Sequence, residues 1–209
     1  MGSNPIIRGE LNKNKSVLIM IHGRGATAED ILCLANHLPV ENFVLIAPQV
    51  VGNTWYPHSF MAPQSQNEPF LSNSLEEIDT TVKNVVEKGI SFENIFFLGF
   101  SQGACLTLEY VTRNAKKWGG IIAFTGGLIG DKLTLENYKG DFSGTEVYIG
   151  TSNPDPHVPV NRVKETEQLL RKMNADVIIE IFEQMGHTII QKELISAGNL
   201  LTKSKTNGN

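Results

Sequence analysis

The sequence predicts a single-domain α/β fold, with a mostly parallel central sheet and helices on both faces. Short continuous apolar runs rich in β-branched residues, such as residues 17–21, are typical of strands buried on both faces. Segments with helical apolar spacing separate these runs along the whole chain, and such alternation favours a parallel sheet. The 209 residues, 41% of them apolar, contain no repeat or linker and suit one core.

The first part of the chain predicts two strands, one helix and a long irregular segment. Residues 16–21 and 43–47 are apolar runs that predict buried strands. Residues 28–38 have helical apolar spacing and stop at a proline. Residues 49–71 show no periodicity, and their aromatic content argues against disorder. We therefore expect this stretch to be a functional loop without cap-domain character.

The elements after this loop alternate regularly. A helix is expected to begin with Ser72 or Asn73 as its N-cap, since both residue types accept from free N–H groups. The expected strands are residues 95–98, 119–124, 146–150 and 176–182, the expected helices are 102–115, 160–173 and 189–201, and 130–143 is expected to be a loop. The domain is predicted to span residues 1–202, with 203–209 as a disordered tail.

Composition narrows the classes of function. The net charge is −4 and the basic residues are scattered, so the sequence shows no basic patch of the kind that binds nucleic acid. No apolar run approaches the ~18 residues of a membrane span. The two cysteines, Cys33 and Cys105, make no disulfide framework, which favours a reducing, cytoplasmic location. Cys105 is expected to pack in the core. Without metal-binding or dinucleotide-binding motifs, no metal or cofactor is expected.

The pentapeptide Gly99-Phe100-Ser101-Gln102-Gly103 directly follows the apolar run 95–98 and opens the helix 102–115. A strand that runs into G-x-S-x-G and then a helix predicts a nucleophile elbow, a sharp turn that exposes a serine hydroxyl. The two outer glycines are expected to be steric requirements, because the turn brings strand and helix backbones too close for a Cβ. The motif therefore makes Ser101 the candidate nucleophile.

Two further strands each deliver one suitable side chain at the carboxyl end, where open α/β sheets bind ligands. Asp155 follows the strand at 146–150, and His187 follows the strand at 176–182. A serine hydroxyl needs a neutral imidazole to take its proton, and the resulting imidazolium needs a carboxylate to orient and stabilise it. The chain order Ser101, Asp155, His187 is that of an α/β-hydrolase. We predict that these three residues form a catalytic triad.

Other residues compete for these roles. His157 is only two residues from Asp155, so both lie on one short loop. On such a loop His157 could hardly pair with Asp155 and reach Ser101 at the same time. We therefore expect His157 to lie at the rim of the site. His22 ends the first strand and is expected to position the loop that follows. Asp131 and Asp141 lie in a polar loop with no strand immediately before them.

Acyl transfer also requires donors for the oxyanion that forms on the attacked carbonyl. The backbone N–H of Gln102, directly after the nucleophile, is one expected donor. The other is expected from the His22-Gly23-Arg24-Gly25 loop, through the backbone N–H of Arg24. The Arg24 side chain is not needed for this role; it is expected to lie in solvent or, alternatively, to attract acidic substrates.

Four segments carry a resemblance to a known family: His22-Gly23-Arg24-Gly25-Ala26, Gly99-Phe100-Ser101-Gln102-Gly103-Ala104, Asp155-Pro156-His157-Val158-Pro159 and Gly186-His187-Thr188-Ile189. They span nearly the whole chain, which resembles the phospholipase/carboxylesterase family of α/β-hydrolases. The resemblance implies a Ser101, Asp155 and His187 triad with Arg24 and Gln102 at the oxyanion hole. Arg24 stands where that family often carries a bulky apolar residue.

A small hydrolase without a cap domain is expected to present an open cleft. Trp55, Tyr56, Phe60 and Met61 are predicted to line it, although Trp55 and Phe60 could instead anchor the loop to the core. The predicted activity is hydrolysis of small esters with short to medium acyl chains, with thioesters or lysophospholipids as further candidates. The alternatives are a lactonase similar to dienelactone hydrolase and a catalytically silent binding module. A homodimer is compatible with the sequence.

Overall fold

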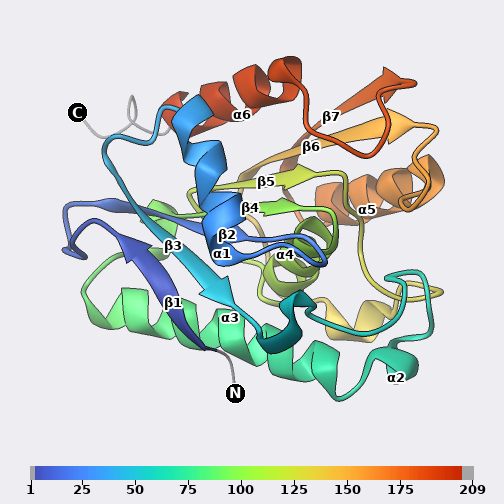
Figure 1. Ribbon diagram of the computed structural model, residues 1–209, viewed down its shortest axis with the longest axis horizontal. Helices are drawn as coiled ribbons and strands as arrows, with labels where there is room; N and C mark the ends of the chain where they lie inside the picture. Colours follow the sequence, from blue (N-terminus) through green and yellow to red (C-terminus); the bar gives the residue numbers. More distant parts are fainter. Residues whose placement is uncertain (1–2, 204–209) are drawn as a thin grey trace.

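Seven strands form one sheet, in the order β1-β3-β2-β4-β5-β6-β7, in the computed structural model, which describes residues 3–203 (Figure 1). β1 (Ser3–Arg8) pairs antiparallel with β3 (Phe43–Gln49), and all other neighbouring strands are parallel. The other strands are β2 (Ser16–Ile21), β4 (Ile95–Phe100), β5 (Gly120–Phe124), β6 (Glu146–Asn153) and β7 (Asp176–Glu183). The carboxyl ends of the six parallel strands therefore meet at one edge.

Helices cover both faces of the sheet (Figure 1). α1 (Ala28–Leu32) and α6 (Gln191–Lys203) bury apolar side chains against one face. α3 (Phe70–Glu87), α4 (Gln102–Arg113) and α5 (Val160–Lys172) do so against the other face. Alternate residues of each central strand enter the two cores, which explains the continuous apolar runs in the sequence. The predicted α/β fold with a mostly parallel sheet is confirmed.

Two N-terminal features differ from expectation. β1 was not predicted, because its sequence contains only one short apolar pair, Ile6-Ile7. The strand is stabilised by its pairing with β3. The helix expected over 28–38 ends at Leu32 and tightens into a 3₁₀ helix, η1 (Cys33–His37). Leu38 is extended, because the following Pro39 excludes the helical conformation from it.

The stretch 49–71 is more structured than predicted. It contains the 3₁₀ helix η2 (Val51–Asn53) and the short helix α2 (Gln64–Asn67). α3 begins at Phe70, with Pro69 as its N-cap, rather than after Ser72 or Asn73. The Glu68 carboxylate instead accepts the backbone N–H of Ser72 at 3.1 Å and so takes over the capping role.

Smaller differences concern the ends of elements. β6 continues three residues beyond the predicted 146–150, to Asn153, because it stays paired with β7 as far as Glu183. α6 includes Thr202 and Lys203, so helical structure extends into the predicted tail. The rest of that tail, 204–209, lies outside the described residues. Two further 3₁₀ turns, η3 (Phe92–Asn94) and η4 (Leu135–Asn137), lie in connecting segments.

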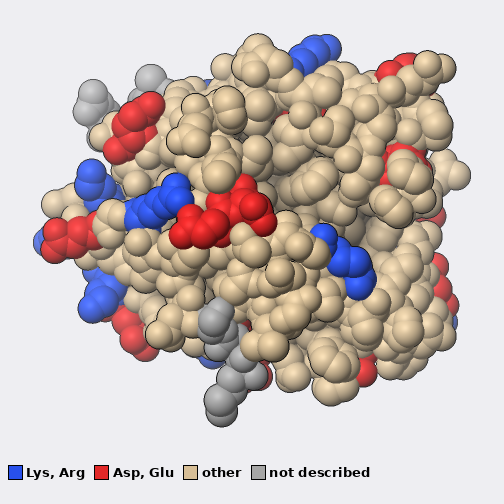
Figure 2. Space-filling view, in the orientation of Figure 1, with Lys and Arg blue, Asp and Glu red and all other residues tan. Residues whose placement is uncertain are grey.

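The surface carries charges of both signs. On the face seen in Figure 2, lysines, arginines, aspartates and glutamates are dispersed among uncharged residues, with no continuous basic patch. Within residues 3–203, no helix combines the length and the apolar character that crossing a membrane requires.

Candidate active site

Ser101 occupies a strained turn between β4 and α4. Its backbone has φ 54° and ψ −119°, a conformation that L-residues rarely adopt outside functional sites. A Cβ on Gly99 would overlap the backbone of Gly103 and Ala104, and a Cβ on Gly103 would overlap the carbonyl of Ile21. Both glycines are thus steric requirements, as predicted: Gly99 allows the close approach of the helix, whereas Gly103 allows that of the neighbouring strand β2, a contact that was not predicted.

Ser101, His187 and Asp155 form a continuous chain of hydrogen bonds. The Ser101 hydroxyl lies 2.7 Å from Nε2 of His187, and Nδ1 of His187 lies 2.9 Å from Oδ2 of Asp155. With the ring proton on Nδ1, the ring donates to Asp155 and accepts from Ser101. The three side chains come from the ends of β4, β6 and β7, and the fold brings them together as predicted.

Asp155 is held as a carboxylate. Its side chain is fully buried, and its Oδ1 accepts the backbone N–H groups of His157 and Val158, each at 2.8 Å. Burial by itself raises the pKa of Asp155, but the two N–H groups and the His187 ring favour the charged form and bring the pKa below its usual value. The carboxylate is therefore ready to stabilise an imidazolium.

His187 is also fixed by aromatic contacts. The ring of Phe100 lies on one side, 5.3 Å between centroids, and the ring of His157 meets it edge-on at 4.9 Å. His157 lines the cleft as an exposed side chain, which matches the expectation of a rim histidine.

The other histidine and aspartates considered for the triad form hydrogen bonds elsewhere. His22 is fully buried, and its Nδ1 contacts the carbonyl of Gly23 at 2.8 Å, in the turn that follows β2. Asp141 caps an exposed turn by accepting the N–H of Ser143. Asp131 is exposed, and its backbone carbonyl accepts from Arg162. Within the described residues, none of these side chains forms a hydrogen bond with Ser101 or His187.

The two residues predicted to donate to the oxyanion line the same cleft as Ser101. Gln102 is the first residue of α4, and Arg24 lies in the turn after β2. Neither backbone N–H donates a hydrogen bond within residues 3–203. Gln102 also stands at the amino end of α4, which carries the positive end of the helix dipole.

The side chains of the same two residues hold one wall of the cleft, a role that was not predicted. The Arg24 guanidinium donates to the backbone carbonyls of Tyr56, Pro57 and His58 at 2.9, 3.0 and 2.8 Å. Gln102 donates from Nε2 to the Tyr56 carbonyl at 2.8 Å. Arg24 is exposed, as expected, but its guanidinium is held by these three carbonyls rather than free in solvent. Only the tertiary fold brings these carbonyls close to the side chains of Arg24 and Gln102, so no sequence signal could have revealed the contacts.

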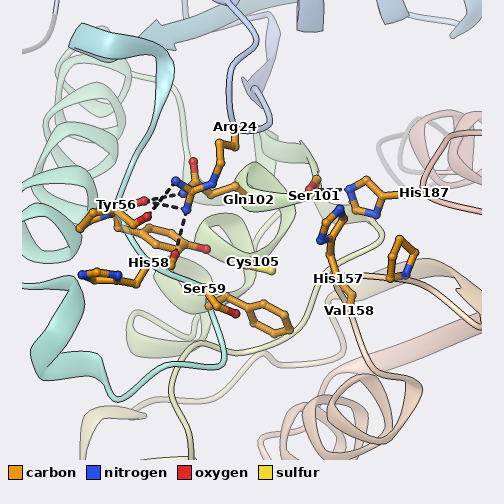
Figure 3. Close-up of a pocket in the computed structure, with 13 residues that line it drawn as sticks. Arg24, Tyr56, His58, Ser59, Ser101, Gln102, Cys105, His157, Val158 and His187 are labelled. Carbon is orange, nitrogen blue, oxygen red and sulfur yellow. Dashed lines mark hydrogen bonds between the residues drawn. The ribbon is translucent and has the colours of Figure 1, made fainter.

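A cleft of about 480 Å³ opens beside Ser101. In Figure 3, Ser101, His187 and His157 lie on one side of it, and Arg24 and Tyr56 lie on the other. The lining is mixed polar and apolar and consists of Arg24, Tyr56, Pro57, His58, Ser59, Phe60, Ser101, Gln102, Cys105, Pro156, His157, Val158 and His187.

Of the four residues predicted to line the cleft, Tyr56 and Phe60 do so, whereas Trp55 and Met61 do not. Trp55 is 1% exposed, and its indole N–H donates to the carbonyl of His22 at 2.8 Å. This residue anchors the loop to the core, the alternative considered for it. Met61 packs against the core on the same side of the sheet.

Cys105 lies one turn after Ser101 on α4 and is 1% exposed. Burial raises the pKa of its thiol to about 12, so the side chain stays uncharged at neutral pH. The expected core position is confirmed, and the thiol also contributes to the floor of the cleft. Among residues 3–203, no three histidine, cysteine, aspartate or glutamate side chains gather as a metal site would require.

The family model of the phospholipase/carboxylesterases matches residues 3–205. The chain belongs to this family. Its sequence is 30% identical to acyl-protein thioesterase 1 of Saccharomyces cerevisiae, in an alignment that covers 95% of this chain and 96% of the yeast protein. The family is hydrolytic, so the chain is a hydrolase of the carboxylesterase type.

Solved structures of similar proteins have the same fold as this chain. The phospholipase/carboxylesterase of Dyadobacter fermentans superposes with a TM-score of 0.93 at 49% identity, covering 95% of each chain. The Bacillus cereus carboxylesterase superposes with a TM-score of 0.80 over 98% of this chain and 95% of its own, and at 18% identity it supports the α/β-hydrolase fold alone.

Proposed function

We propose that the enzyme cleaves carboxylic esters with short to medium acyl chains through a covalent acyl-enzyme, with Ser101 as nucleophile, His187 as general base and acid, and Asp155 as the carboxylate partner. The observation that carries this proposal is the unbroken hydrogen-bond chain from Ser101 through His187 to Asp155, built on a positive-φ turn. A structural serine would need neither the strained turn nor the aligned imidazole.

The geometry supports a two-step reaction. Ser101 Oγ attacks the ester carbonyl carbon while His187 Nε2 takes the hydroxyl proton, and Asp155 stabilises the imidazolium. The backbone N–H groups of Arg24 and Gln102 stabilise the oxyanion. His187 then gives the proton to the departing alcohol oxygen. A water molecule attacks the acyl-enzyme with His187 again as base, and the carboxylic acid leaves as Ser101 regains its proton.

The size and lining of the cleft support the proposed substrate class. About 480 Å³ of space with a mixed polar lining suits a small ester better than a long acyl chain, which would need a continuous apolar channel. The likeness to a yeast acyl-protein thioesterase makes short acyl thioesters the second substrate class to measure. Both substrates would pass through the same acyl-enzyme.

Labelling with a fluorophosphonate probe, followed by mass spectrometry of the peptides, tests the nucleophile. We expect a stoichiometric adduct on Ser101 of the wild-type enzyme and none on the Ser101→Ala variant. para-Nitrophenyl esters from acetate to laurate then test chain length, with fastest turnover expected at short to medium chains. A folded protein that neither reacts with the probe nor cleaves any ester or lactone would support the silent binding module instead.

A further inference from the structure

One hydroxyl group joins the two loops that carry Asp155 and His187. Oγ of Ser152 donates to the backbone carbonyl of Pro154 at 3.0 Å and accepts the backbone N–H of Gly186 at 2.9 Å. Pro154 directly precedes Asp155, and Gly186 directly precedes His187. The hydroxyl therefore connects the residue before the carboxylate to the residue before the imidazole.

Ser152 reaches both loops because of its place in the sheet. β6 and β7 run side by side (Figure 1), and Ser152 is paired with Phe182, one residue before each strand ends. Ser152 is fully buried, so its hydrogen bonds form in a low-dielectric interior, where they are stronger than in water. The bond to the Pro154 carbonyl orients the hydroxyl proton, which leaves the oxygen lone pairs for the N–H of Gly186.

The backbone at Gly186 would otherwise rotate easily. Gly186 has φ 78°, and apart from its chain neighbours nothing lies within 4 Å of the place where its Cβ would be. A glycine in open space changes its backbone angles at little cost, and rotation there moves His187 directly. The hydrogen bond to Ser152 opposes this rotation. On the other side of His187, Oε2 of Glu193 accepts the Ile190 N–H at 2.9 Å, so the histidine lies between two fixed points.

We propose that Ser152 is a positioning residue, whose hydroxyl sets the distance between Asp155 and His187. A fixed distance keeps Nε2 of His187 in line with Ser101. The inference rests on the proposed function, because Ser152 does not line the cleft and acts only through the triad. The triad distances of 2.9 and 2.7 Å leave little tolerance, since a displacement of about 1 Å at a reacting group can lower a rate about a hundredfold.

Ser152→Ala tests this role, because it removes the hydroxyl and nothing else of the strand. We expect kcat for para-nitrophenyl butyrate to fall by about tenfold to a hundredfold. KM should stay within about threefold of the wild type, because the residues that line the cleft are unchanged. The downfield proton NMR resonance of the N–H that bridges His187 and Asp155 should shift or broaden in the variant, because that hydrogen bond is no longer held at one length.

Thr145→Val is the matched control, since Thr145 precedes the opposite end of β6 and is also fully buried. Its hydroxyl likewise accepts one backbone N–H, that of Trp118 at 2.9 Å, and donates to a backbone carbonyl, that of Phe142 at 2.7 Å. Both substitutions leave a buried N–H and a buried carbonyl without this partner, so both should lower the melting temperature. We expect only Ser152→Ala to lower kcat and to change the NMR resonance.

Wild-type kcat and an unchanged resonance in Ser152→Ala would overturn the inference and leave the proposed function standing, if Ser101 of the wild type is labelled and the ester is cleaved. Equal losses of kcat in Ser152→Ala and Thr145→Val would assign the effect to stability and overturn it as well. Absence of both labelling and cleavage in the wild type would overturn the proposed function and this inference with it. Should Ser152→Ala not fold, Ser152→Cys replaces it, because a thiol fills the space but forms only weak hydrogen bonds.

Discussion

The guanidinium of Arg24 and the side-chain amide of Gln102 donate hydrogen bonds to the same atom, the carbonyl oxygen of Tyr56. The two residues predicted to supply the oxyanion hole therefore also hold the wall of the cleft that contains Tyr56. Movement of that wall would change the position of both residues. In the proposed mechanism, stabilisation of the oxyanion and the shape of the cleft are thus coupled through one carbonyl group.

Replacing Arg24 by methionine should lower kcat/KM for para-nitrophenyl butyrate by about tenfold to a hundredfold. The variant keeps the backbone N–H but loses the bonds to three carbonyls, and small displacements of a positioned group have effects of this size. The matched control is Arg8→Met, because Arg8 only pairs with Glu29 at the surface. Wild-type kcat/KM in Arg24→Met would show that the wall does not depend on the guanidinium.

Replacing Asp155 by asparagine should reduce kcat by up to ~10⁴, because the amide cannot stabilise the imidazolium and favours the wrong tautomer of His187. Two backbone N–H groups and the His187 ring favour the carboxylate and lower its pKa, so we expect no loss of activity from protonation of Asp155 above its ordinary pKa. Asp131→Asn is the control, since the Asp131 side chain is exposed. Equal kcat in both variants would contradict the assignment.

The two neighbouring histidines of the cleft should differ sharply in their effects on activity. His187→Ala removes the base and should lower kcat by about 10³ or more, whereas His157→Ala should stay within about tenfold of the wild type. The reason is geometric: His187 alone bridges Ser101 and Asp155, and the side chain of His157 only meets the His187 ring edge-on. Single-turnover kinetics with para-nitrophenyl acetate measures both. A greater loss in the His157 variant would reverse the assignment.

Glu193 should make stability depend on pH. This residue of α6 is fully buried, and burial raises its pKa from 4.5 to about 7, although the Ile190 N–H lowers it and nearby Glu180 raises it further. The folded state thus favours the protonated form, so the free energy of unfolding falls as pH rises from about 4.5 to about 7.

Glu193→Gln should remove this pH dependence and raise stability at high pH relative to low pH by on the order of 3 kcal/mol. Urea unfolding on both sides of the titration range measures the difference. Glu136→Gln, at an exposed position of η4, is the control and should retain the wild-type profile. A Glu193→Gln profile parallel to that of the wild type would show that the carboxyl does not titrate in this range.

Local sequence patterns were sufficient for the α/β architecture and for the nucleophile elbow. Apolar runs and helical spacing depend on neighbouring residues, and so does the turn at Ser101, where two glycines permit the close backbone approach. The chain order of Ser101, Asp155 and His187 could also be recognised, because each residue follows a strand and parallel strands end at one edge. β1 escaped recognition because pairing with β3 stabilises it more than its own composition does.

The sequence by itself thus determined the six parallel strands, the main helices that cover them and the three residues that follow strands at one edge of the sheet. Only the tertiary structure decided how side chains distant along the chain meet. Ser101 contacts a histidine 86 residues away, and Arg24 contacts carbonyls more than thirty residues away. An aromatic residue is equally suited to a core or a cleft, and the packing of the whole loop buries both Trp55 and Tyr56 but lets only Tyr56 of the two line the cleft. Such contacts have no local signature, because they depend on the folded positions of several elements at once.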